Sequence, residues 1–137
     1  MSRIFIGLIF LLPCVLPVGA QTGAEKVDSS LWFKVKNGAS AEFLVILQEQ
    51  ADVRAAERFA SKTEKGRYVY ETLLDAATRT QPPVRQRLYQ AGAPVQSFWI
   101  INALWSYGDA GLIGQIAGMP EVARVEDNPV WHLDRPF

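Results

Sequence analysis

Apolar residues recur at two different spacings along this chain, and the spacing predicts where strands and helices form. Residues 43–47 make a short apolar run that is rich in β-branched side chains and bounded by polar residues, which is typical of a strand. Asp52 is placed to cap a helix over 53–60, and a polar link at 61–66 leads into a longer helix that begins near Arg67.

The second half of the chain repeats this change of spacing. Pro82 and Pro83 are expected either to interrupt the helix that begins near Arg67 or to begin a new one, and the helical spacing continues up to Gly92, the expected C-cap. Residues 98–101 and 103–107 are two apolar runs, and Asn102 between them predicts a hairpin-like pair of strands.

A short helix and a last strand complete the predicted order. Asp109 is expected to cap the helix, Gly118 and Pro120 to end it, and the strand to span 122–126. The order β-α-β-β-α-β predicts an α+β, ferredoxin-like βαββαβ fold, in which a four-stranded antiparallel sheet carries its helices on one face.

Both faces of the predicted sheet are apolar. In the first strand Leu44 and Ile46 point to one face, and Phe43, Val45 and Leu47 point to the other. In the 98–101 run Trp99 and Ile101 point opposite to Phe98 and Ile100. An exposed apolar face on a small domain is typical of a binding surface. A leader segment, the C-terminal tail or a second copy of the chain are the other possible covers of this face.

The first twenty residues have the pattern of a cleaved signal peptide. Arg3 precedes an apolar stretch over 4–18, and small residues lead up to Ala20. Pro13 and Pro17 interrupt the stretch, which is also shorter than the roughly 20 residues of a spanning helix. The expected location is therefore secreted or periplasmic, with no membrane attachment after cleavage.

The rest of the chain divides into three predicted parts. Residues 21–41 are mostly small and polar and are expected to form a flexible leader, although Trp32 could instead dock on the domain. Residues 42–129 form the domain, and 130–137 form a tail. The lone Cys14 falls within the signal peptide, so burial rather than disulfides must stabilise the mature chain.

The chemistry-bearing residues do not predict an enzyme. His132 is the single histidine and stands in the tail, where no regular element fixes its position. One histidine and scattered acids do not predict a metal site, and no cofactor is expected. The 14 basic and 14 acidic residues become a net charge of −1 once Arg3 leaves with the signal peptide, which does not favour a nucleic-acid partner.

Four segments, taken in order, resemble the propeptide (proteinase-inhibitor) domain of secreted subtilisin-like serine proteases. They are 42–47, 98–103, 108–113 and 119–126, the last with the pattern P-x-V-A-x-V-E. The resemblance implies an inhibitor and folding chaperone whose sheet face binds the protease. It implies either a free-standing inhibitor or an N-terminal fragment of a protease precursor.

The resemblance also implies that the tail runs through the substrate cleft of the protease as an added strand. Such clefts favour an apolar side chain next to the scissile bond and another three residues earlier. Leu133 and Val130 meet these demands, with Trp131 and His132 between them. On the sheet face, the expected contacts are Leu44, Ile46, Trp99 and Ile101.

Two functions of other classes share the predicted topology. RNA-recognition domains expose aromatic residues on such a sheet, but the export signal and the net charge argue against that function here. A non-inhibitory homodimer or binding module in the exported compartment is the alternative that stays open.

Overall fold

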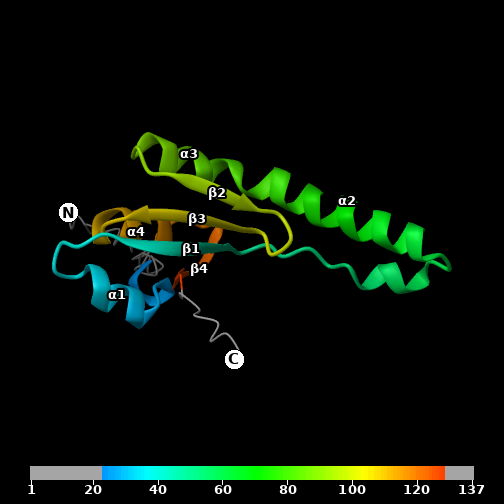
Figure 1. Ribbon diagram of the computed structural model, residues 1–137, viewed down its shortest axis with the longest axis horizontal. Helices are drawn as coiled ribbons and strands as arrows, with labels where there is room; N and C mark the ends of the chain where they lie inside the picture. Colours follow the sequence, from blue (N-terminus) through cyan, green and yellow to red (C-terminus); the bar gives the residue numbers. More distant parts are fainter. Residues whose placement is uncertain (1–22, 129–137) are drawn as a thin grey trace, which may run out of the picture.

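The fold is built on a four-stranded antiparallel sheet with the strand order β2-β3-β1-β4 (Figure 1). The computed structural model describes residues 23–128. The strands are β1 (Ala41–Leu47), β2 (Val95–Phe98), β3 (Ala103–Gly108) and β4 (Val122–Asp127). Helices α2 (Lys62–Thr80) and α3 (Pro82–Gln90) connect β1 to β2, and α4 (Ala110–Ala117) connects β3 to β4. This arrangement confirms the α+β, ferredoxin-like prediction.

The hydrophobic core lies against one face of the sheet. Phe43 and Val45 of β1 are completely buried there, as are Leu104 of β3 and Val125 of β4. The helices contribute the other half of the same cluster: Val84 and Leu88 from α3, and Ile113, Ile116 and Ala117 from α4. Full burial of each large apolar side chain stabilises the fold by about 1.5–3 kcal/mol, so packing of the helices on this face stabilises the sheet.

The N-terminal segment belongs to the folded unit, and the prediction of a flexible leader is wrong for the described residues. A 3-10 turn, η1 (Gly23–Lys26), precedes helix α1 (Ser29–Val35), whose Leu31 and Val35 are fully buried in the core. The Nζ of Lys26 donates hydrogen bonds to the carbonyl oxygens of Met119 and Val122, at 3.1 and 2.7 Å. Leu31 and Val35 are four residues apart and therefore share one face of α1. Their burial, together with the Lys26 hydrogen bonds, explains why this mostly polar segment belongs to the fold.

Helix α2 extends well beyond the end of the sheet (Figure 1). Together with the 3-10 turn η2 (Arg54–Arg58) it forms what we call the arm, and only Ala76 and Ala77 of α2 are buried. The predicted helix over 53–60 is thus one 3-10 turn. The predicted link at 61–66 is instead the start of α2, because Ser61 and Glu64 form a capping box. Among residues 23–128 no helix, including α2, is both long and apolar enough to span a membrane.

Candidate protein-interaction surface

Alternate residues of each strand lie on the sheet face opposite the core, which we call the open face. Leu44 of β1 pairs with Trp105 of β3 and Glu126 of β4, so these three side chains share that face. The register assigns to the open face Glu42, Leu44, Ile46, Gln96, Phe98, Ala103, Trp105, Tyr107, Arg124 and Glu126. The buried residues of the described helices instead form one cluster with Phe43 and Val45, which lie on the core side.

The open face has an apolar centre and a polar rim. Leu44 and Trp105 are half-buried at the centre, beside Ile46, which is 8% exposed. Tyr107 is 47% exposed, and Arg124 forms an ion pair with Glu126 at the β4 side. An apolar centre surrounded by polar groups is the usual composition of a protein–protein interface.

The carboxylate of Glu42 connects the open face to Asn128, two residues before the predicted tail. Its Oε2 accepts hydrogen bonds from the indole Nε1 of Trp105, at 3.3 Å, and from the Nδ2 of Asn128, at 2.7 Å. Asn128 is the last described residue, directly after β4. The last described residue therefore lies beside the Glu42 carboxylate that also holds the Trp105 ring on the open face.

Two of the four residues predicted for this face lie elsewhere. Leu44 and Ile46 are on the open face, but Trp99 and Ile101 are in the turn between β2 and β3, because β2 ends at Phe98. The turn closes on Asn102, which has a φ of +42°. The prediction that 98–101 is a strand is therefore wrong beyond its first residue.

A buried hydrogen-bond network holds this turn against the base of the arm. The Nδ2 of Asn102 donates to the carbonyl oxygen of Glu49, at 2.7 Å, and to the hydroxyl of Thr80, at 2.8 Å. Its Oδ1 accepts a hydrogen bond of 3.1 Å from the Nε2 of Gln81. Asn102 and Gln81 are 2% and 3% exposed. One side chain thus joins the β2–β3 turn to the segment entering the arm and to the helix end leaving it.

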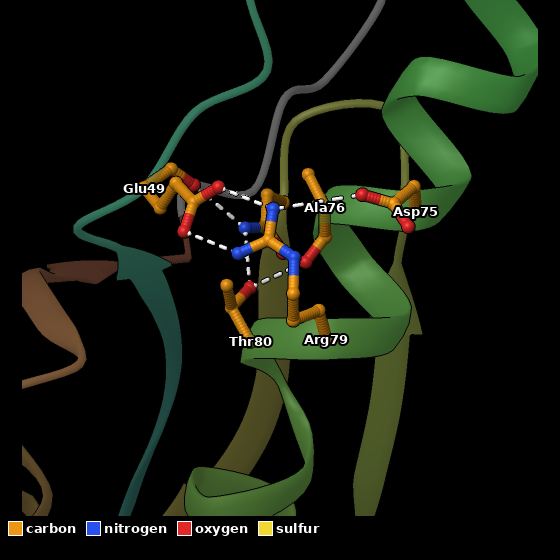
Figure 2. Close-up of polar contacts among 6 residues, drawn as sticks. Glu49, Asp75, Ala76, Arg79 and Thr80 are labelled. Atoms are coloured by element: carbon orange, nitrogen blue, oxygen red, sulfur yellow. Dashed lines mark hydrogen bonds and ion pairs between the residues drawn. The ribbon is translucent and has the colours of Figure 1, made fainter.

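An ion pair reinforces the same junction, as Figure 2 shows. The Arg79 guanidinium donates two hydrogen bonds to the Glu49 carboxylate, at 2.8 and 2.5 Å, and lies 3.6 Å from the carboxylate of Asp75. The hydrogen bond from Arg79 lowers the pKa of Glu49, and the same bond raises the pKa of Arg79. Both groups are charged at neutral pH, which favours the bidentate geometry.

Sequence reasoning did not assign Glu42, Trp105 and Tyr107 to the binding face. Alternation within the predicted strand over 103–107 places the two aromatic residues on one side of it. Which side that is depends on the pairing of Trp105 with Leu44. Strand register depends on residues far apart in the sequence. The local pattern therefore showed that the two aromatic residues share a side but not which face of the sheet that side is.

The predicted tail contacts Val130, Trp131, His132 and Leu133 lie outside the described residues. Within residues 23–128, no group of three or more His, Cys, Asp or Glu side chains is arranged to hold a metal ion.

Comparison with known proteins returns no family model, curated protein or solved structure that matches this chain. The function must therefore be inferred from the open face and from its contact with Asn128, two residues before the tail.

Proposed function

We propose that the chain binds a subtilisin-like serine protease as a propeptide-type inhibitor and folding chaperone. The open face contacts the surface of the protease, and the tail occupies its substrate cleft. The observation that carries the proposal is the pair of hydrogen bonds from Trp105 and Asn128 to Glu42. Since Asn128, two residues before the tail, is hydrogen-bonded to Glu42 of the open face, a single partner is within reach of both.

The tail segment has the side-chain pattern that the cleft requires. In an added strand, successive side chains point in opposite directions and main-chain hydrogen bonds supply affinity. Leu133 enters the primary pocket and Val130 the apolar pocket three residues earlier. The chaperone activity follows by mass action, because a partner that binds only the native protease stabilises that state.

Inhibition of peptide hydrolysis tests the proposal directly. The purified chain is titrated against several subtilisin-like proteases, with trypsin-like enzymes as controls. Leu133→Asp and Trp105→Ala are each expected to raise the inhibition constant at least tenfold, by placing a carboxylate in an apolar pocket and by removing the central aromatic ring of the open face. Tyr89→Ala is the matched control, since Tyr89 is 60% exposed on α3. Absence of inhibition at micromolar concentrations contradicts the proposal.

The charge pattern of the open face favours one further candidate, a non-inhibitory homodimer or binding module in the exported compartment. Arg124 and Glu126 lie side by side on this face. A twofold axis between these two residues would place Arg124 of one copy against Glu126 of the other. Sedimentation velocity distinguishes the two functions, because a stable dimer that Trp105→Ala dissociates supports self-association.

A further inference from the structure

The free edge of β2 is a second surface, which adjoins the open face at Gln96 and Phe98. β2 pairs only with β3, and within residues 23–128 no strand lies on its other side. Gln96 and Ser97 are exposed there. Unpaired strand edges are ready to pair with another chain, and proteins usually protect them with charges or a covering segment.

The opposite edge of the sheet shows such protection, and β2 does not. Val27 forms a bridge with Val125 of β4, and β4 carries three charged residues in its six. The four residues of β2, Val-Gln-Ser-Phe, include neither a charge nor a proline. The β2 edge is therefore open to an incoming strand.

Two hollows flank this edge. One of about 220 Å³ lies between β2 and the α2–α3 junction, and one of about 330 Å³ lies at the β2–β3 turn. Ser97 and Trp99 line both hollows. The Trp99 ring is held edge-on against Tyr70 of α2, with ring centroids 5.2 Å apart. Apolar side chains line most of the remaining walls: Leu74, Ala77, Pro82, Phe98, Ile100 and Ile101.

The two hollows adjoin each other at Ser97 and Trp99, which line both. Their other walls come from different parts of the fold: α2 and α3 for the first hollow, and Phe98 with the β2–β3 turn for the second. Ser97 pairs with Leu104, a core residue, whereas Phe98 pairs with Ala103 on the open face. In a strand added along β2, one side chain would point toward the hollow beside α2 and α3 and the next toward the turn hollow. Two consecutive apolar residues therefore fit the two hollows.

The first hollow favours a negatively charged group in the bound chain, because Arg85 lines it. Arg85 is half-buried and is the one charged residue that lines it. Arg85 has no ion pair within residues 23–128, and no described carboxylate lines either hollow. A guanidinium in such surroundings is complemented by a carboxylate of the bound chain.

We infer that the free edge of β2 binds an extended segment of another polypeptide as an added strand. The segment carries two consecutive apolar side chains, one for each hollow, and a nearby acidic residue for Arg85. This site is independent of the proposed inhibitory function, which uses the open face and the tail.

Titration of the ¹⁵N-labelled full chain with the peptide acetyl-Thr-Val-Ile-Glu-Thr-Val-amide tests the inference by NMR. Saturable shifts are expected at the backbone amides of β2 and at Trp99. Arg85→Gln is expected to weaken binding about tenfold, and Arg87→Gln, which lies on the same helix but outside both hollows, to leave it unchanged. A peptide with Lys in place of Glu should also bind about tenfold more weakly, without any change to the protein.

Each of four results of these peptide titrations overturns the inference. They are the absence of saturable binding at millimolar peptide, shifts centred on Leu44 and Trp105 of the open face, equal affinity of the Arg85→Gln variant, and equal affinity of the Lys peptide. Concentration-dependent shifts of the β2 amides without peptide also overturn it, because they show that a second copy of the chain occupies the edge.

Discussion

Replacement of Asn102 by alanine is expected to destabilise the domain far more than a typical substitution in a turn. The Asn102 side chain makes three hydrogen bonds, with the Glu49 carbonyl, the Thr80 hydroxyl and the Gln81 amide. It is almost completely buried. Alanine removes all three bonds, so the Glu49 carbonyl, the Thr80 hydroxyl and the Gln81 amide each lose a partner.

The magnitude follows from two contributions. Each lost hydrogen bond costs about 1 kcal/mol of net stability, so the three together cost about 3 kcal/mol. The φ of +42° adds about 1 kcal/mol for alanine, which tolerates the left-handed region less well than asparagine. Gln81 keeps the Phe98 carbonyl as an acceptor, at 3.2 Å, which reduces the total. We expect a loss of about 3–4 kcal/mol, a large share of the roughly 5–15 kcal/mol of a typical domain.

Urea denaturation, followed by far-UV circular dichroism and tryptophan fluorescence, measures this loss. Asn102→Gly separates the two contributions, because glycine accepts a positive φ and should be about 1 kcal/mol more stable than the alanine variant. Gln96→Ala, at an exposed position of β2, is the control and should stay within about 0.5 kcal/mol of the parent. An alanine variant as stable as this control refutes the reasoning.

Three other predictions follow from the fold. Leu31→Ala should lower the free energy of unfolding by about 3 kcal/mol in the same denaturation assay, because Leu31 is fully buried; a loss under 1 kcal/mol would mean that α1 is not part of the core. The pKa of Glu49 is lowered, so its stabilising interaction with Arg79 is present above pH 4.5 and is lost as the pH falls through the lowered pKa. The difference in unfolding free energy between the parent and Glu49→Gln should therefore shrink below pH 4.5. A difference that does not change with pH contradicts the pairing. Ser61→Ala should cost about 1 kcal/mol of helix stability and speed amide hydrogen exchange in the first turn of α2, whereas unchanged exchange argues against the capping box.

Local patterns were sufficient to predict the order of the elements. Strand β1 was expected from the apolar run at 43–47, and α4 from Asp109, whose side chain accepts a hydrogen bond from the Leu112 amide at 2.9 Å. In both cases the determining interaction lies within a few residues of the signal. The fold class followed, because the order of strands and helices leaves few ways to build one layered core.

The end of β2 could not be predicted in this way. An apolar run such as 98–101 is compatible with a strand and equally with an exposed turn. The choice depends on Asn102, whose partners Glu49 and Thr80 lie 53 and 22 residues away in the sequence. The local pattern does not contain these partners, and the predicted placement of Trp99 and Ile101 failed for that reason.

The helix α1 was missed for a related reason. Seven residues are too few to form a stable helix in isolation, so its stability comes from tertiary packing. Only Leu31 and Val35 supply that packing, while Trp32 and Phe33 remain exposed. The strongest apolar signal in the segment thus belongs to residues that do not enter the core.

The contact between Glu42 and Asn128 and the hollows beside β2 lie at opposite ends of the sheet, so the two proposed sites can be tested separately. Glu42 lies at the start of β1 and is hydrogen-bonded to Asn128. The hollows beside β2 lie near the end of β1, where Ile46 pairs with Ala103. The hydrogen bonds of Asn102 stabilise the β2–β3 turn beside these hollows and do not involve Glu42 or Asn128. Asn102→Gly should therefore weaken peptide binding at β2 and leave inhibition through the open face and tail unchanged. If both activities fall together under conditions in which the variant is fully folded, the two surfaces act as one.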